Sequence, residues 1–167
     1  MDKKSDKYKL LFVCLGNICR SPAAEGVMLR LIDERNLADR ISVDSAGTYG
    51  GHAGSLPDNR MRIHARRRGY ELTHRSRRVT GDDFVNFDLI VGMDAGNVYS
   101  LREMAASPEE TRKIVSMGQF IRQFPHYDHV PDPYYEGSEG FELVLDLLED
   151  ACEALLDYIL KNDFFTK

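Results

Sequence analysis

Hydrophobic positions along the chain fall into short continuous runs and into longer stretches with a helical period. The segment 8–13, which contains the run KLLFV, is typical of a buried strand. From Ala24 the apolar residues recur at helical spacing and predict a helix over about 22–36. Pro22 is expected as the first residue of that helix, because its missing backbone N–H leaves no hydrogen bond unmade there. Residues 14–21 therefore connect the end of a strand to the start of a helix.

The rest of the chain repeats this alternation. Short apolar runs predict strands at 41–44, 88–93 and 113–117, and helical patterns predict helices at about 57–67, 82–86 and 94–105. The last helix has one apolar stripe, made of Phe141, Leu145, Leu148, Cys152, Leu155 and Ile159. Strands that alternate with helices imply an α/β fold, in which a single domain has a four-stranded parallel sheet with helices on both faces.

Three polar residues follow predicted strands and should meet at one edge of this sheet. Cys14, Ser45 and Asp94 each come directly after a strand, and ligands bind beyond the carboxyl ends of the strands in open parallel sheets. Residues 45–56 form a glycine-rich loop, which is typical of a surface loop beside a site. We therefore expect a site where these segments come together.

The composition is that of an ordinary soluble globular domain. The 167 residues suffice for one hydrophobic core, and no apolar stretch reaches membrane-spanning length. We expect a flexible N-terminal tail at residues 1–7 and one domain over residues 8–167. The three cysteines show no disulfide spacing, which favours a reducing compartment and predicts a cytoplasmic protein.

The net charge of −5 is unevenly distributed along the chain. Eight arginines lie between Arg60 and Arg78, whereas residues 123–160 contain ten acidic residues and neither Lys nor Arg. This pattern leaves two interpretations open: two solvated helical faces, or a basic rim that attracts acidic phosphosubstrates. Nucleic acid is not expected as a partner, because the chain is acidic overall and only Tyr70 is interleaved with the arginines.

The turn at 14–21, with the sequence CLGNICRS, carries the candidate chemistry. Backbone N–H groups at a helix N-terminus favour an anion, so this loop can hold a phosphate-sized dianion and stabilise a thiolate at Cys14. Arg20 adds a planar fork of donors that matches two phosphoryl oxygens. Gly16 and Asn17 tolerate the left-handed backbone that turns loop amides inward. Because the loop and Arg20 supply positive charge, we expect neither a metal nor a cofactor.

The stretch CLGNICRSPAAE resembles the active-site loop of the low-molecular-weight protein tyrosine phosphatases. Later segments are similar to that family in the same order, namely SAGT at 45–48, PDNR at 57–60, DFVNFD at 83–88, MDAGN at 93–97 and DPYY at 132–135. The resemblance covers residues 8–160. It implies a flavodoxin-like fold with strand order 2-1-3-4. It also implies a phosphoric monoester hydrolase that acts on phosphotyrosine and on other aryl phosphates.

The resemblance implies a role for each matching residue. Cys14 would be the nucleophile that forms a cysteinyl-phosphate, and Asp132 would be the general acid that protonates the leaving phenolate. Phosphate would be bound by Arg20 and by the loop residues Leu15, Gly16, Asn17, Ile18 and Cys19. A hydrogen-bonded shell around the loop would consist of Asn17, Ser21, Ser45 and His74, with Ser21 helping the thiolate to leave. The run Arg75-Ser76-Arg77 after His74 departs from the family's pattern.

Residues outside the loop would provide the general acid and the walls of the entrance to the site. Two prolines flank Asp132 and restrict its backbone, which is the stiffness that a positioned acid needs. A second acid, Asp94, is better placed as a helix N-cap. Tyr49, Tyr134 and Tyr135 would wall a slot deep enough for a phenyl phosphate. The family further implies that the tyrosines at 134 and 135 can be phosphorylated.

The sequence predicts less about the roles of the other two cysteines and of the histidines. Cys19 is either a small packing residue or the partner of Cys14 in a disulfide that protects the nucleophile from peroxide. Cys152 falls on the apolar stripe and is expected in the core. The five histidines show no metal-ligand spacing with Cys or carboxylates, so no metal site is expected.

The resemblance also implies the partners. The substrate would be a phosphotyrosine-containing protein, with a tyrosine kinase among the candidates, and the loop would bind a phosphate or sulfate ion. We expect no membrane partner, and we expect a monomer or a weak dimer.

Other functions remain as alternatives. A thiol-dependent arsenate reductase uses this fold and loop, but its relatives need further cysteines near residues 80–95, where this chain has none. A phosphoarginine phosphatase typically has Thr where this chain has Ile18, and the apolar residue favours an aromatic ester. A silent phosphotyrosine-binding module would need neither Cys14 nor Asp132. A nucleotide-binding P-loop is excluded, because the chain lacks G-x-x-x-x-G-K-[ST].

Overall fold

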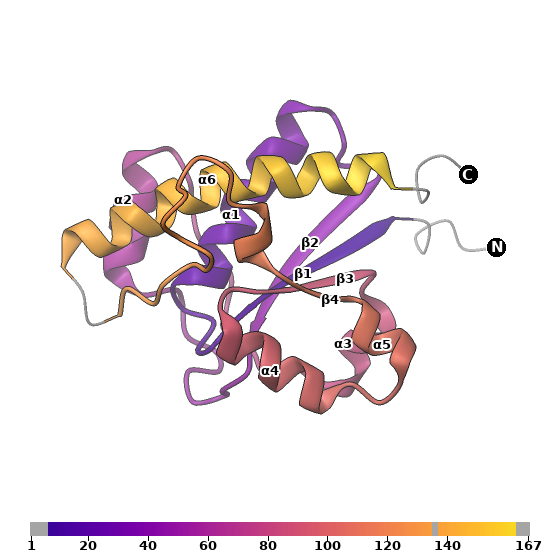
Figure 1. Cartoon of the computed structure of the whole chain (residues 1–167). Coiled ribbons are helices and arrows are strands. Elements are labelled where there is room, and N and C mark those ends of the chain that lie inside the picture. The colour runs from indigo at the N-terminus through magenta and orange to yellow at the C-terminus, as the bar shows by residue number, and fades with distance from the viewer. Residues whose placement is uncertain (1–6, 135–136, 163–167) are drawn as a thin grey trace.

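Four parallel strands form the single sheet of this protein, for which the computed structural model describes residues 7–134 and 137–162. The strands are β1 (Tyr8–Cys14), β2 (Ile41–Gly47), β3 (Leu89–Gly92) and β4 (Ile114–Ser116). Their order is β2-β1-β3-β4, and each neighbouring pair is parallel (Figure 1). The predicted four-stranded, flavodoxin-like α/β fold is therefore confirmed.

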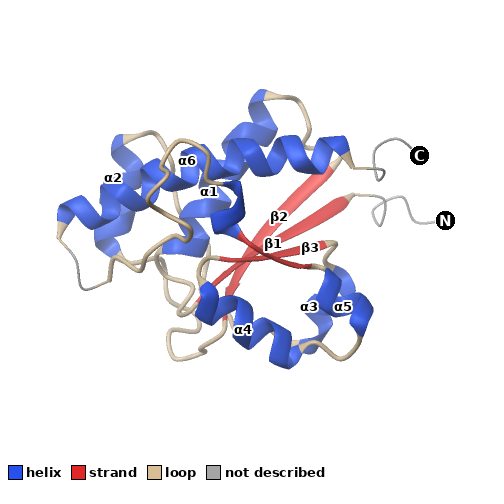
Figure 2. Ribbon diagram, in the orientation of Figure 1, coloured by secondary structure: helices blue, strands red, loops and turns tan. Residues whose placement is uncertain are grey.

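Helices cover both faces of the sheet (Figure 2). One face is covered by α1 (Arg20–Glu34), α2 (Asn59–Arg67) and α6 (Ser138–Lys161). The other face is covered by α3 (Gly81–Asn86), α4 (Ala95–Met104) and α5 (Pro108–Arg112). A 3-10 turn, η2 (Met117–Phe120), follows β4.

The alternation of side chains along β1 divides the core into two layers. Leu10 and Phe12 pack into the cluster that includes the apolar faces of α1 and α6. Leu11 and Val13 pack into a second cluster with residues of α3 and α4. All four side chains are buried, because successive residues of a central strand point to opposite, covered faces.

Element boundaries differ from the sequence-based expectation in a few places. Helix α1 begins at Arg20, so Pro22 lies in its first turn and not at its first residue. Strand β2 continues to Gly47, so Ser45 lies inside the strand, paired with Phe12, and the prediction that it follows the strand was wrong. The short elements α5 and η2 were not predicted, because neither is long enough to display a period.

Two of the arginines between Arg60 and Arg78 form ion pairs that connect different elements of the fold. Arg68, which follows α2, forms ion pairs with Glu142, Asp146 and Glu149 of α6. Arg77 likewise pairs with Asp44 and Asp83. These arginines therefore join elements of the fold, and neither of the two sequence-based interpretations describes them. No helix within the described ranges has the length and apolar character of a membrane span.

Candidate active site

The loop between β1 and α1 wraps around the side chain of Cys14. This thiol is buried at the end of β1, and its Sγ lies 3.1 Å from Ser21 Oγ. The backbone N–H of Ser21 also points at Cys14 Sγ, at 3.4 Å. Cys14 and the loop residues Leu15, Gly16, Ile18, Cys19 and Arg20 line a cavity of about 250 Å³. The predicted nucleophile, arginine and loop thus share one cavity.

Arg20 is held in this cavity by groups from two segments, the start of α4 and residues 130–132. Its Nη1 donates to Asp94 Oδ2 at 2.7 Å and to the carbonyl oxygen of Val130 at 3.0 Å. Its Nη2 lies 3.7 Å from Asp132 Oδ2. The Arg20 side chain is 3% exposed, so these partners fix the direction of the guanidinium group. Asp132 is the more exposed of the two carboxylates near Arg20, and it also lines the cavity.

Asp94 has two structural roles, and the sequence predicted only one of them. Its Oδ1 accepts the backbone N–H of Asn97, which confirms the N-cap of α4. Its Oδ2 binds Arg20, so one carboxylate ties the start of α4 to the start of α1. Although burial alone would raise it, the pKa of Asp94 lies below its ordinary value, because Arg20 and the Asn97 amide hydrogen-bond the carboxylate.

Asn17 is the centre of the hydrogen bonds that support the loop. Its Nδ2 donates to Ser21 Oγ at 2.7 Å and to Ser45 Oγ at 3.1 Å. Its Oδ1 lies 3.0 Å from His74 Nε2 and accepts the backbone N–H of Arg77 at 3.0 Å. Asn17 has no exposed surface. The four residues expected to surround the loop are therefore connected, including His74.

Two glycines allow the backbone to pack closely at this loop. Asn17 has a positive φ of 57°, but Gly16 does not, so the expectation of a left-handed Gly16 was wrong. What constrains residue 16 is space, since a Cβ there would lie 3.0 Å from His52 Cδ2. A Cβ on Gly47 would lie 2.6 Å from the carbonyl oxygen of Leu15. The end of β2 thus presses directly on the backbone of the loop.

The rim of the cavity is aromatic. Tyr49, His52 and Tyr134 line it together with Asp132, and the Tyr49 and His52 rings meet edge to face with centroids 6.1 Å apart. His52 was not among the predicted residues, because a glycine-rich loop gives no period from which a rim position could be read. Tyr135, the third expected wall residue, lies outside the described residues.

The structure places Cys19 and Cys152 without deciding the redox role of Cys19. Both are buried, free thiols, and burial raises the pKa of each. Cys152 lies in the core beside α1, with its Sγ 3.8 Å from the carbonyl oxygen of Ala24, as its place on the apolar stripe predicts. Cys19 lines the cavity, and its disulfide with Cys14 stays a prediction.

Two supporting residues come from the segment where the sequence departs from the family's usual pattern. Ser76 Oγ donates to the carbonyl oxygen of Gly16 at 3.0 Å, and Arg77 provides the amide that Asn17 accepts. Both depend on the approach of residues 74–78 to the loop. That approach follows from the isolated bridge between Gly47 and Arg78, which local patterns do not predict.

Comparisons with known proteins agree on one family. The family model for low molecular weight phosphotyrosine protein phosphatases matches residues 9–164. A Synechocystis protein named as a low molecular weight protein-tyrosine-phosphatase is 47% identical over 154 residues, which cover 92% of this chain and 98% of that protein. A crystal structure of a protein tyrosine phosphatase from Entamoeba histolytica, with Hepes in the active site, has a TM-score of 0.89 at 46% identity and covers 92% of this chain and 97% of its own. The crystal structure of a Drosophila arginine phosphatase has a TM-score of 0.85 at 35% identity, with coverage of 93% and 99%.

Proposed function

Because the chain belongs to the low molecular weight phosphotyrosine protein phosphatase family, we propose that it hydrolyses phosphotyrosine in proteins through a cysteinyl-phosphate intermediate. One observation carries the proposal. The Cys14 thiol, the Arg20 guanidinium and the Asp132 carboxyl group line the same cavity. A nucleophile, a phosphate-binding cation and an acid are the three parts that this chemistry requires.

In the first step the Cys14 thiolate attacks phosphorus, and the bond from phosphorus to the phenolic oxygen breaks. Arg20 and the loop amides stabilise the charge on the equatorial oxygens as the phosphoryl group transfers. Asp132, protonated at this stage, gives its proton to the leaving phenolate. Support for this role comes from its place on the rim, where it is accessible to a leaving group.

In the second step water attacks phosphorus, and the bond from phosphorus to sulfur breaks. Asp132, now ionised, takes a proton from that water, inorganic phosphate forms, and Cys14 leaves as a thiolate. The hydroxyl and the backbone N–H of Ser21 both face Cys14 Sγ and would stabilise the departing thiolate. Asn17 fixes the Ser21 hydroxyl for this role.

The walls of the cavity favour an aryl phosphate. Tyr49, Tyr134 and Ile18 give the cavity apolar sides, against which a phenyl ring can pack. The similar Drosophila protein is named an arginine phosphatase, so phosphoarginine is the alternative substrate class. We propose that Ile18 directs this chain to phosphotyrosine, and a tyrosine-phosphorylated peptide and a phosphoarginine peptide compared on one sample will distinguish the two.

The decisive experiment measures p-nitrophenyl phosphate and phenyl phosphate hydrolysis in the presence of EDTA. Cys14→Ser should abolish turnover of both esters. Asp132→Ala should reduce turnover of phenyl phosphate by roughly 10²-fold or more, and that of p-nitrophenyl phosphate less, since p-nitrophenolate leaves without a proton.

Asp128→Ala is the matched control, because it removes an exposed carboxylate of the same segment that does not line the cavity. It should retain wild-type activity. Turnover that persists in Cys14→Ser would refute the mechanism. An unchanged rate for phenyl phosphate in Asp132→Ala would refute the assignment of the acid.

A further inference from the structure

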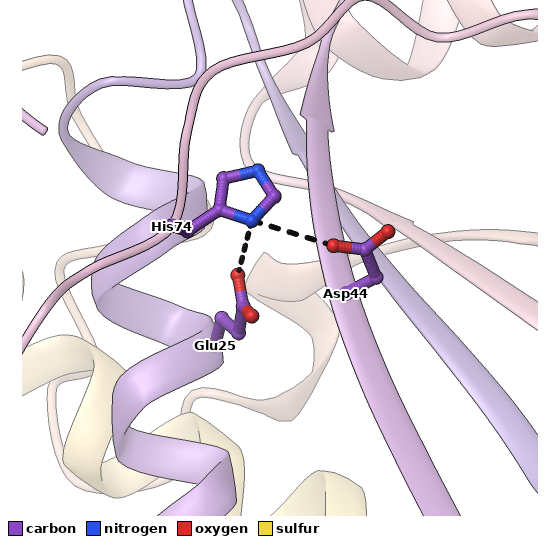
Figure 3. Close-up of side chains that lie close together, drawn as sticks. All are labelled: Glu25, Asp44 and His74. Atoms are coloured by element: carbon purple, nitrogen blue, oxygen red, sulfur yellow. Dashed lines mark ion pairs between the residues drawn. The ribbon is translucent and has the colours of Figure 1, made fainter. Parts of the chain in front are cut away.

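Charged side chains outside the cavity contact the active-site loop and its surroundings. At one place, carboxylate oxygens of Glu25 and Asp44 lie 3.4 Å from His74 Nδ1 (Figure 3). His74 in turn contacts Asn17, so this group supports the loop itself. At another place, the charged residues come from the PDNR segment at 57–60, which no step of the proposed reaction uses. These residues connect the loop to a wall of the cavity.

The guanidinium group of Arg60 is held in one orientation by Asp58. Arg60 Nε and Nη2 donate to the two carboxylate oxygens of Asp58 at 3.1 and 2.9 Å, and the two planar groups match in this paired geometry. The Asp58 side chain is only 12% exposed, and it also caps α2 by accepting the Arg60 amide. The backbone N–H of Asp58 donates to the carbonyl oxygen of Ile18 at 2.7 Å. Arg60 is therefore attached, through one residue, to the loop that binds phosphate.

The same guanidinium group lies against two aromatic rings. Its central carbon is 4.9 Å from the centre of the Phe141 ring and 5.3 Å from the centre of the Tyr134 ring, and both distances are typical of cation–π contacts. Phe141 is buried, and its ring is stacked on His64 with centroids 5.6 Å apart, so packing fixes its position. Tyr134 lines the cavity. Arg60 thus connects a fixed ring of the core to a wall of the active site.

Ile18 and Tyr134 are two of the apolar sides of the cavity, and Arg60 connects them from outside. We propose that Arg60 is a positioning residue, which holds the Tyr134 ring at the distance from the loop that fits a phenyl group and so selects aryl phosphates. This inference rests on the proposed function, since it concerns the ring of an aryl substrate. Phosphate itself is bound by Arg20 and the loop amides, so the affinity for a phosphate without a ring is independent of Arg60.

The test compares the inhibition constants (Ki) of two competitive inhibitors of p-nitrophenyl phosphate hydrolysis. Benzylphosphonate carries a phenyl ring and is not hydrolysed, whereas inorganic phosphate has no ring. Inhibitors are preferred to substrates because the Tyr134 amide also donates to Asp132 Oδ1, at 3.0 Å, so that turnover of a substrate mixes ring binding with acid catalysis.

Arg60→Met keeps an unbranched side chain and removes the guanidinium group. We expect the Ki of benzylphosphonate to rise about two- to fivefold, the range that one exposed cation–π contact supplies, and the Ki of phosphate to stay unchanged. A general loosening of the fold would instead weaken both inhibitors. Arg66→Met is the matched control, because Arg66 also belongs to α2 but pairs with the exposed Glu71, and it should change neither constant. If Arg60→Met fails to fold, Arg60→Lys carries the test, since an ammonium group cannot match both oxygens of Asp58.

A double-mutant cycle tests whether Arg60 acts through the Tyr134 ring. In a Tyr134→Ala background, Arg60→Met should have no further effect on the Ki of benzylphosphonate. An equal loss with and without the ring would overturn the proposal, and so would a benzylphosphonate Ki that Arg60→Met leaves unchanged or that rises in parallel with that of phosphate. A wild-type chain that does not hydrolyse p-nitrophenyl phosphate would refute the proposed function, and this inference with it. An active chain that fails the comparison of inhibitors would refute the role of Arg60 alone.

Discussion

A single carboxylate, that of Asp94, controls how Arg20 faces the cavity. Arg20 is almost completely buried, so water cannot replace this partner easily. Within residues 7–134 and 137–162, the other hydrogen-bond and ion-pair partners of the guanidinium are a carbonyl oxygen and Asp132 at 3.7 Å, and the latter distance is too long for a hydrogen bond. The direction of the phosphate-binding cation therefore depends mainly on one residue of another helix.

Asp94→Asn tests this dependence with little damage to the fold, because Asn is as good an N-cap as Asp. We expect kcat for p-nitrophenyl phosphate to fall roughly tenfold to a hundredfold, since a hydrogen bond to a charged group contributes about 1.5–3 kcal/mol. Ser107→Ala removes the N-cap of α5, far from Arg20 in sequence, and should leave kcat unchanged. An Asp94→Asn enzyme with wild-type kcat would show that Arg20 needs no anionic partner.

The same variant should change how stability depends on pH. The pKa of Asp94 is lower in the folded protein than its ordinary value of 3.8, so the folded state favours the ionised form. The stability that this carboxylate contributes is complete well above pH 3.8 and is lost as pH falls toward the lower, folded pKa. Urea unfolding between pH 3 and 7 should show a wild-type advantage over Asp94→Asn that is constant near neutrality and shrinks below about pH 4. An advantage that does not vary with pH would contradict this assignment.

Residues of the site differ in how far the sequence could predict them. Cys14, Arg20 and Ser21 are fixed by spacing within one loop, so their proximity follows from a strand, a turn and a helix start. Asp132 comes from far along the chain, and only the resemblance to a family identified it. The contact between Arg20 and Asp94 joins the ends of two strands, and a carboxylate that caps a helix gives no sign of a second partner.

At the scale of elements, the acidic helix α6 is matched to the basic segment that follows α2. Arg68 contacts three carboxylates on successive turns of α6, and Tyr70 donates to Glu149 at 2.6 Å. Glu142 is also paired with His64 of α2. Although the carboxylates are partly exposed and screened, one arginine that serves three of them acts as a network, which stabilises more than an isolated surface pair.

Arg68→Ala should lower the free energy of unfolding by about 1–2 kcal/mol, because it leaves three neighbouring carboxylates without their shared cation. Arg66→Ala breaks a single exposed ion pair with Glu71 and should change the free energy of unfolding by less than about 0.5 kcal/mol. Urea unfolding at low and high salt measures both. The difference between the two variants should shrink at high salt, and equal losses would argue against a network.

For the whole molecule, the parallel direction of the strands follows from the alternation of strand and helix, and their order was implied by the family resemblance, but the length of β2 follows from neither. The run from Ile41 to Asp44 is apolar enough to predict a strand, and Ser45 and Gly47 then resemble the start of a loop. Pairing with β1 extends the strand to Gly47, and the bridge to Arg78 follows on its other side. These pairing partners exist only in the assembled sheet, so a prediction from the local sequence pattern places the end of the strand too early.

This extension brings the sheet into contact with the loop, and Gly47→Ala tests its importance. The added Cβ would lie 2.6 Å from the carbonyl oxygen of Leu15 and 3.0 Å from the amide nitrogen of Asn17, and both are backbone atoms that cannot rotate away. We expect a loss of about 1–3 kcal/mol in unfolding free energy, as for other overpacked positions. Turnover of p-nitrophenyl phosphate should fall as well, because the amides that face the phosphate must shift.

Gly81→Ala provides the control for this substitution. A Cβ on Gly81 meets no atom within 4 Å, so activity should be unchanged, and stability should rise slightly because Ala favours the first turn of α3. Kinetics and urea unfolding on the two variants separate a clash from the general effect of replacing glycine. If Gly47→Ala kept both wild-type stability and wild-type turnover, the loop would have to accommodate the methyl group without moving its amides. That result would show that the end of β2 does not position the loop amides.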